Sequence, residues 1–232
     1  MKVTTIGPIQ PLFWRLVVYC ATWGRLFGLL FVFLRQAREL VRLQLMEEKI
    51  RTEGKILPGG ILKVGSFLNQ QIDTGFLRAM GREIARLYGG SGITKVLTIE
   101  ASGIAIAAAA AMELGVPMLF AKKHKTSNVD GTVYSTVVHS FTHGTDYTVV
   151  VSRDYLLPGD TVLLVDDFLA NGAALRGLVE LSRQAGATVA GAAIAIEKAF
   201  QGGGDALRAA GIRVESLAVI ESMDGGTVTF RR

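Results

Sequence analysis

Residues 162–174 read VLLVDDFLANGAA, and this stretch decides the fold. The apolar run at residues 161–165 is typical of a strand that is covered on both faces, as strands of parallel sheets are. Two acids, Asp166 and Asp167, end the run, and Asn171-Gly172 is a loop signal before a helical pattern at residues 173–184. The stretch therefore predicts a buried strand, a loop and a helix in succession.

The chain on both sides of this unit repeats the same alternation of short apolar runs and helical patterns. Between Asp73, a plausible N-cap, and Gly89 an apolar stripe recurs at helical spacing. Further strands are expected at residues 93–99, 116–121, 188–196 and 213–220, a hairpin at 132–141 and 147–152, and helices at 47–53 and 104–114. This order predicts an α/β fold with a mostly parallel sheet and helices on both faces.

In such sheets ligands bind beyond the carboxyl ends of the strands, so the segments that follow the strands are the candidate sites. After residues 161–165, the loop before the helix offers backbone N–H groups to an anion, whereas the two acids repel one. A ligand with a phosphate at one end and hydroxyls at the other, such as a ribose 5-phosphate, satisfies both halves. The alternative is that one acid caps the helix and the other is solvated.

This arrangement resembles the 5-phosphoribosyl-1-pyrophosphate (PRPP) signature of type I phosphoribosyltransferases. The wider resemblance is to the bacterial xanthine phosphoribosyltransferases, and it covers residues 46–232. It rests on five motifs in order, LKVGSFLN (62–69), IEASGI (99–104), AKKHK (121–125), VDDFLANG (165–172) and IEKAF (196–200). The fold it implies is that of the type I phosphoribosyltransferases, a mostly parallel central sheet flanked by helices with a small hood.

The resemblance also implies roles for individual residues. Asp166 and Asp167 would hold the ribose hydroxyls as catalytic residues. The phosphate would lie on Ala170, Asn171, Gly172, Ala173 and Ala174, the pyrophosphate on Ala101, Ser102, Gly103, Lys123 and Lys125, and the xanthine on Leu62, Asn69, Lys198 and Phe200. Ala101 stands where family members usually have serine, which removes one hydroxyl contact. Without the resemblance, Ser102 reads as a helix N-cap, the lysines as a solvated loop and Phe200 as core.

The implied reaction joins xanthine to PRPP, giving xanthosine 5′-monophosphate and pyrophosphate in purine salvage. Magnesium would arrive on PRPP without direct protein ligands, and the enzyme would be a cytoplasmic homodimer. A lysine donor at Lys198 suits a 6-oxopurine and disfavours adenine, whose 6-amino group also donates. Two alternatives remain: a guanine or hypoxanthine phosphoribosyltransferase, and a non-catalytic regulator that senses PRPP.

The positive charge of the chain is confined to its first 45 residues. The 25 basic and 20 acidic residues give a net charge of +5, and residues 1–45 hold six of the bases and one of the acids. Residues 46–232 are therefore neutral, with 19 of each, which argues against a nucleic-acid partner. Cys20 is the one cysteine, so no disulfide framework is expected.

The N-terminal residues 1–45 form a separate, hydrophobic and basic segment. Residues 12–34 are long enough to span a bilayer, but Arg25 lies near their middle, where an arginine costs about 2.5–3.5 kcal/mol. We expect an upstream extension without function, before a phosphoribosyltransferase domain at residues 46–232. A membrane anchor and an additional core helix are the alternatives, and a membrane partner is expected only in the first of these.

Overall fold

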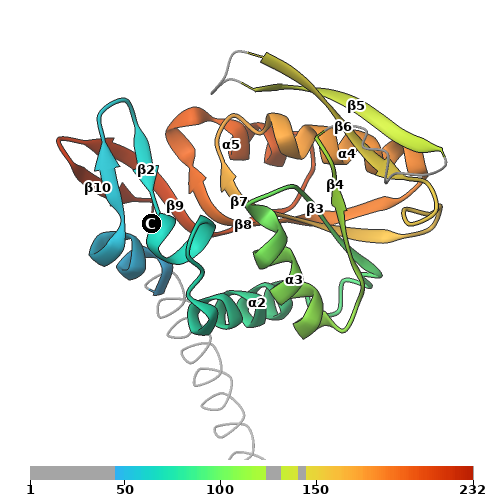
Figure 1. Cartoon of the computed structure of the whole chain (residues 1–232), viewed down its shortest axis with the longest axis horizontal. Coiled ribbons are helices and arrows are strands. Elements are labelled where there is room, and N and C mark those ends of the chain that lie inside the picture. Colours follow the sequence, from blue (N-terminus) through green and yellow to red (C-terminus); the bar gives the residue numbers. More distant parts are fainter. Residues whose placement is uncertain (1–44, 124–131, 141–144, 232) are drawn as a thin grey trace, which may run out of the picture. The chain divides into compact units, whose positions relative to one another are not determined.

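The computed structural model describes residues 45–123, 132–140 and 145–231 (Figure 1). The expectations for residues 1–44, and that for Lys125, lie outside the described residues, so the domain boundary near Met46 stays a prediction. None of the helices in the described ranges is long and apolar enough to cross a membrane.

A six-stranded sheet in the order β10-β9-β8-β7-β3-β4 forms the centre of the molecule. Its first five strands in the sequence are parallel, and β10 is antiparallel to β9. They are β3 (Lys95–Ile99), β4 (Met118–Ala121), β7 (Thr161–Leu169), β8 (Thr188–Lys198), β9 (Val214–Asp224) and β10 (Thr227–Phe230). The predicted α/β fold with a mostly parallel sheet is confirmed.

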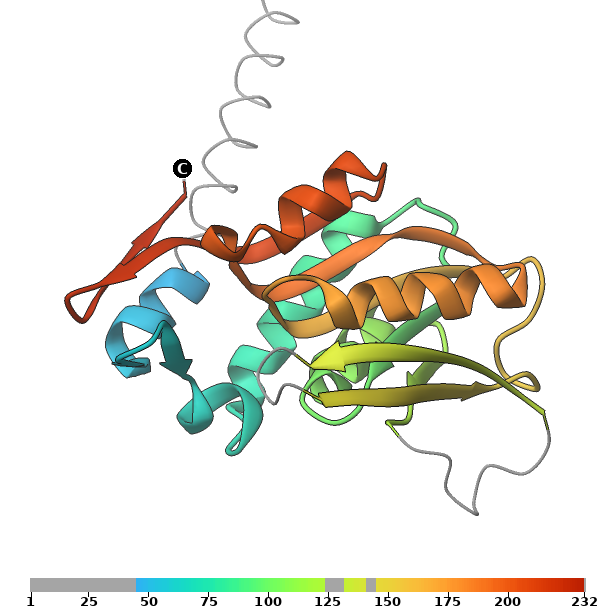
Figure 2. The same ribbon diagram turned by 90° about the horizontal axis from the view of Figure 1, so that it is seen from above.

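Both faces of this sheet are covered, as the apolar run in β7 predicts. Leu163 and Val165 pack in one hydrophobic cluster and Val162 and Leu164 in another, because successive side chains of a strand point to opposite faces. The first cluster includes α2 (Thr74–Tyr88), α3 (Gly103–Leu114) and the helical residues 45–53. The second includes α4 (Ala173–Ala185), and Figure 2 shows the antiparallel ribbon of β5 (Val133–Ser140) and β6 (Thr145–Ser152) alongside it.

Several local predictions can be compared with the structure. Asp73 caps α2, since its carboxylate accepts a hydrogen bond from the Phe76 N–H at 3.0 Å. Ser102 occupies the N-cap position of α3, as its reading as an N-cap requires, but its side chain makes no capping hydrogen bond. Strand β7 does not stop at Val165 but continues through both acids to Leu169, because its pairing with β8 extends as far as Leu169↔Glu197.

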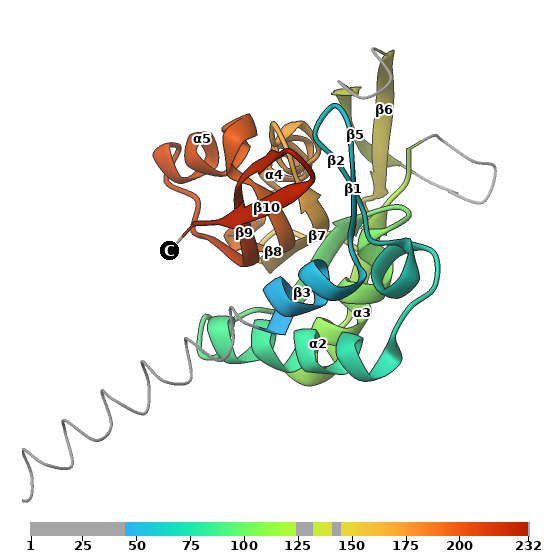
Figure 3. The same ribbon diagram turned by 90° about the vertical axis from the view of Figure 1, so that its left-hand side faces the viewer.

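The short elements are the ones that the sequence patterns did not indicate. They are the antiparallel hairpin of β1 (Lys55–Leu57) and β2 (Ile61–Lys63), the π-helix η1 (Gly65–Asn69), the 3-10 turn η2 (Ala199–Gln201), α5 (Gly203–Ala209) and β10. Figure 3 shows the β1–β2 hairpin facing the viewer. Its tip contacts the end of β8, where the Lys198 ammonium donates to the Gly60 carbonyl.

The strand order reverses between β3 and β7. From β3 the chain moves outward to β4, then returns to place β7 on the other side of β3, with β8 and β9 following in that direction. Such a reversal leaves a crevice outside the carboxyl ends of the two strands, which is where ligands of open α/β sheets bind. The segments at that crevice are residues 100–103 after β3 and the acid pair in β7.

Candidate active site

The two acids of β7 differ in their surroundings. Asp166 is buried, with 7% of its surface exposed, whereas Asp167 is half-buried. Burial, and then the charge of Asp167, raise the pKa of the Asp166 carboxyl well above its usual range. Asp166 Oδ1 accepts a hydrogen bond from the Asp167 N–H at 2.9 Å, and Asp167 Oδ1 accepts one from the Phe168 N–H at 3.0 Å. A partly desolvated acid pair of this kind can hold hydroxyl groups and stabilise a developing positive charge.

The loop after β3 lies against this acid pair. A Cβ atom on Gly103 would collide with the Thr98 hydroxyl and lie 3.1 Å from Asp166 Oδ1, so only glycine allows α3 to begin this close to β7. Ala101 is exposed and Ser102 is half-buried. The structure therefore brings the predicted pyrophosphate residues Ala101, Ser102 and Gly103 next to the acids.

Lys123 approaches the same place from the end of β4. Its backbone N–H donates to Glu100 Oε1 at 2.7 Å, and its ammonium lies 5.5 Å from the centroid of the Tyr147 ring. Its charge acts on Asp166, where it lowers the carboxyl pKa against the larger effect of burial. Burial raises the pKa of the Tyr147 hydroxyl, and the charge of Asp166 adds to that. The Lys123 charge is therefore close enough to act on Asp166. Its contact with the pyrophosphate stays a prediction, and Lys125 lies outside the described residues.

The predicted phosphate residues form the connection from β7 to α4. Gly172 has a φ of +82°, a conformation that side chains rarely adopt, and it is the residue from which α4 starts. The Asn171 Oδ1 accepts a hydrogen bond from the Ala173 N–H at 2.9 Å. Residues 170–174 thus surround the N-terminus of a helix of 13 residues, where backbone N–H groups and the helix dipole favour an anion.

Lys198 and Phe200 meet at the tip of the β1–β2 hairpin. The Lys198 ammonium donates to the Gly60 carbonyl at 3.0 Å and lies 5.5 Å from the centroid of the Phe168 ring, and its burial lowers its pKa. A Cβ atom on Gly60 would lie 3.7 Å from the Phe200 ring, which is 45% exposed, so Phe200 is not a core residue. The structure therefore places a half-buried cation beside the Phe168 ring and at the hairpin tip that Phe200 contacts.

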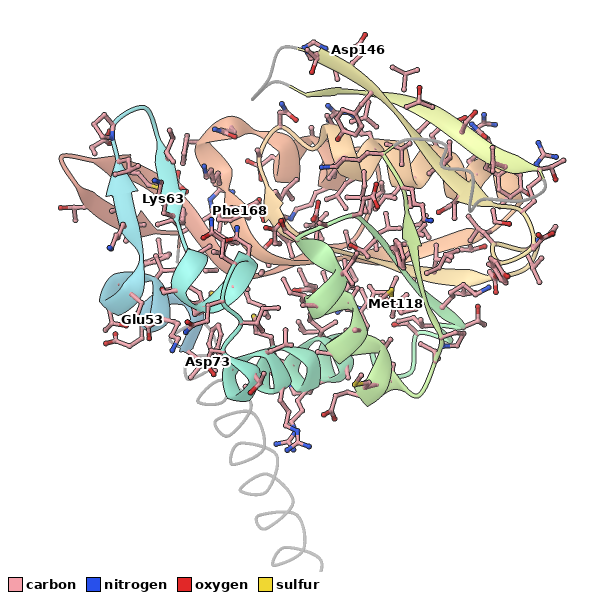
Figure 4. The ribbon with its side chains drawn as sticks, in the orientation of Figure 1. Glu53, Lys63, Asp73, Met118, Asp146 and Phe168 are labelled. Carbon is pink, nitrogen blue, oxygen red and sulfur yellow. The ribbon has the colours of Figure 1, made fainter. Side chains whose placement is uncertain are left out.

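Phe168 is a member of this group that the sequence reasoning missed. It is labelled in Figure 4 at the end of β7, toward the β1–β2 hairpin. Because alternate residues of a strand point the same way, Phe168 shares the side of Asp166. That alternation was the available signal, but it applies only if β7 continues beyond its acids.

Leu62 and Asn69 line another part of the hairpin region. Leu62 is buried with 7% of its surface exposed, and Asn69 is the last residue of η1. Both border a cleft of about 440 Å³, whose lining also includes Lys63, Gly65 and Gln70. The hairpin thus connects two sets of predicted base-binding residues, since Gly60 at its tip contacts Lys198 and β2 carries Leu62.

The sequence as a whole is similar to known proteins over most of its length. The model of the phosphoribosyl transferase domain family matches residues 70–205. A xanthine phosphoribosyltransferase of Bifidobacterium longum is 54% identical over 192 residues, which are 82% of this chain and 100% of that protein. A xanthine phosphoribosyltransferase of Heliobacterium modesticaldum is 50% identical over 188 residues, covering 81% and 100% of the two chains.

Solved structures support the fold. The adenine phosphoribosyltransferase of Giardia lamblia in complex with 9-deazaadenine covers 75% of this chain and 96% of its own, with a TM-score of 0.64 and 24% identity. The Trypanosoma brucei adenine phosphoribosyltransferase, in complex with AMP, pyrophosphate and ribose-5-phosphate, gives a TM-score of 0.62 at 19% identity over 75% and 79% of the two chains. At these identities the likeness concerns the fold alone, and the fold is that of these enzymes.

Proposed function

The chain belongs to the phosphoribosyltransferase family and, within it, to the xanthine phosphoribosyltransferases, and on that premise we propose how its site performs purine salvage. The enzyme transfers the 5-phosphoribosyl group from PRPP to N9 of xanthine. The bond from C1′ to the pyrophosphate oxygen breaks, the bond from C1′ to N9 forms, and the N9 proton passes to water. The observation that carries the proposal is the convergence of the acid pair, the α4 loop and Lys198 at the carboxyl ends of β3, β7 and β8.

The ribose end of PRPP is assigned to β7 and α4. The N–H groups at the start of α4 bind the 5-phosphate, and Asp166 and Asp167 accept hydrogen bonds from the ribose 2′- and 3′-hydroxyls. As the pyrophosphate leaves, positive charge develops on the ribosyl group, and the adjacent carboxylates stabilise it without having to move. The loop at residues 101–103 and the Lys123 ammonium receive the pyrophosphate, together with Lys125.

The base end is assigned to Lys198. Its ammonium already donates to a carbonyl, that of Gly60, and within the described residues no carboxylate pairs with it. The 6-oxo group of a purine is also a carbonyl acceptor. The Lys198 ammonium can therefore replace its hydrogen bond to Gly60 by one to the base at little cost in free energy. Phe168 and Phe200 supply ring faces for stacking, and Asn69 pairs with the 2-position edge that distinguishes xanthine from hypoxanthine.

The residues present fit a magnesium ion that arrives with PRPP. Mg²⁺ commonly binds through phosphate oxygens and water with few protein ligands, which are oxygen atoms, and the acid pair lies beside the loop that we assign to the pyrophosphate. When bound, the ion neutralises charge on the departing pyrophosphate. Asp167, at the half-buried end of the acid pair, is the residue we assign to face it.

Three further statements belong to the same proposal. The catalytic domain comprises residues 46–232, the enzyme acts as a homodimer, and it works in the cytoplasm. About four fifths of this chain covers the whole length of the relatives, which supports the extent of the domain. The homodimer and the cytoplasmic location rest on the resemblance to the family alone.

The test is a turnover assay with a panel of bases. The full chain is incubated with PRPP, Mg²⁺ and xanthine, guanine, hypoxanthine or adenine, and the nucleotide and pyrophosphate are quantified. We expect the highest kcat/KM with xanthine and none with adenine. A preference for guanine or hypoxanthine would contradict the assigned base, and PRPP binding without any product would indicate a regulator instead.

Two variants locate the ends of the substrate and act as controls for each other. Lys198→Met should reduce kcat/KM for xanthine by about a hundredfold, because a charge-assisted hydrogen bond of about 3 kcal/mol is lost, while the affinity for PRPP is kept. Asp167→Asn should weaken PRPP binding instead. Equal effects of both variants on both substrates would contradict this division of the site.

A further inference from the structure

The connection between β7 and α4 is held from outside by two hydrogen-bond donors. The Gly203 N–H, at the start of α5, donates to the Ala170 carbonyl at 3.1 Å. The Arg176 guanidinium donates through Nη1 to the Asn171 carbonyl at 2.8 Å. These contacts involve residues to which the site described above assigns no role, and they engage two consecutive carbonyls of the loop.

The direction of these carbonyls decides where the loop N–H groups point. In a trans peptide the C=O and the N–H lie on opposite edges of one plane, so fixing the carbonyls of Ala170 and Asn171 also fixes the N–H groups of Asn171 and Gly172. Neither of these two N–H groups donates to an acceptor in the described part of the chain. The N–H groups of Asn171 and Gly172 therefore remain available to a ligand, while the carbonyls of Ala170 and Asn171 are engaged by Gly203 and Arg176.

Arg176 fixes this loop at two successive peptides. Its backbone N–H donates to the Gly172 carbonyl at 2.9 Å, while its side chain holds the Asn171 carbonyl. The guanidinium also covers the turn closely, since a Cβ atom on Gly172 would lie 3.2 Å from Nη1. On the other side the loop packs directly on Gly203, whose added Cβ would collide with the Ala170 carbonyl and lie 2.6 Å from the Gly172 nitrogen.

We propose that Arg176 is a positioning residue for PRPP: by holding the Asn171 carbonyl, it keeps the loop in the conformation that offers N–H groups to the 5-phosphate. This inference rests on the proposed function for the identity of the anion. Without the guanidinium, the Asn171–Gly172 peptide can rotate and present its carbonyl oxygen, which repels a phosphate. Arg176 is exposed, so replacing it leaves the core intact.

The test compares Arg176→Gln with Arg183→Gln on the same helix. Arg183 is also exposed, and among the described residues its guanidinium pairs only with Glu180, at 2.8 Å from each of two guanidinium nitrogens. Each variant removes one positive charge from α4. We expect Arg176→Gln to raise the KM for PRPP about tenfold, because one charge-assisted hydrogen bond is lost. The KM for xanthine and the Tm should not change. Arg183→Gln should change none of these three quantities.

High salt separates positioning from simple attraction of the polyanion. If Arg176 acts through the loop conformation, the ratio of the two PRPP KM values persists at about 1 M salt, where charges are screened beyond about 3 Å. A ratio that falls to one at high salt, or an equal rise in both KM values, would overturn the proposal. The Kd for PRPP with Mg²⁺, measured by calorimetry, tests the same ratio without turnover, so a failure of the proposed reaction is distinguishable from a failure of this inference.

Discussion

Asp166 is a carboxyl group whose burial opposes its ionisation. The pKa of Asp166 in the folded protein is raised above the ordinary value of 3.8. At a pH between these two pKa values, the native state holds a proton that the unfolded state has lost. The free energy of unfolding therefore falls as the pH rises through this range. Asp166→Asn, a neutral side chain of the same shape, should remove this loss and be more stable than the natural protein at pH 7, by about 1–3 kcal/mol. Urea unfolding at pH 4 and pH 7 measures the difference, with the exposed Asp224→Asn as the control. If the difference in free energy of unfolding between Asp166→Asn and the natural protein does not increase from pH 4 to pH 7, the burial argument is contradicted.

Thr98 presents a related case, since its hydroxyl is fully buried and lacks a hydrogen-bond partner among the described residues. The hydroxyl faces Gly103, and a Cβ atom at position 103 would collide with it. Removing an unsatisfied hydroxyl while keeping its shape relieves a desolvation penalty. Thr98→Val should therefore keep or raise the Tm, whereas Thr98→Ala should lower it by leaving a void. If the valine variant is as unstable as the alanine variant, the hydroxyl is bonded in solution.

The elements differ in how far the sequence specifies them. The first half of β7 was predicted from its continuous apolar run, the other parallel strands from short apolar runs that alternate with helical patterns, and α2 from its stripe and the Asp73 cap. The strands of the β1–β2 hairpin have only three residues each, too few for a period to show. The chain of α5 begins Gly-Gly, which local propensity disfavours in a helix. Its conformation depends on tertiary contacts that no local pattern contains.

One of those contacts is the buried ion pair between β8 and α5. Glu197 is fully buried, and its carboxylate receives both terminal nitrogens of Arg208, at 2.8 and 2.7 Å, as well as the Ser216 hydroxyl. Arg208→Met leaves this carboxylate buried without a cation, with the Ser216 hydroxyl as its remaining donor, so the free energy of unfolding should fall by about 3–5 kcal/mol. Adding Glu197→Met should restore much of it. The surface pair is the control, since Arg183→Met should change stability little. A double variant no better than Arg208→Met would contradict this account.

The candidate site as a whole combines residues that the motifs indicate with residues that only the fold brings there. The acid pair and Lys198 lie in the carboxyl-terminal parts of β7 and β8, and the loop at residues 170–174 follows β7. The rule that ligands bind at the carboxyl ends of the strands places them together. Tyr147, Gly203 and Arg176 come from three other elements and carry no local signal. Their roles depend on the approach of β6, α5 and α4 to the crevice, which is a property of packing.

The extent of the catalytic domain can be tested by two truncations that differ by eight residues. Met46 and Ile50 are both 2% exposed and belong to the first hydrophobic cluster, and Lys49 donates to the Asp73 carboxylate at 2.8 Å. A chain that starts at Met46 keeps these contacts, so it should retain its Tm and its kcat/KM for xanthine. Its net charge falls from +5 to zero, so it should no longer be retained on a cation exchanger. A chain that starts at Gly54 lacks two buried core side chains, each worth about 2–5 kcal/mol, and should unfold. If the Met46 chain folds but turns over no xanthine, residues 1–45 contribute to the site and the proposed boundary is wrong.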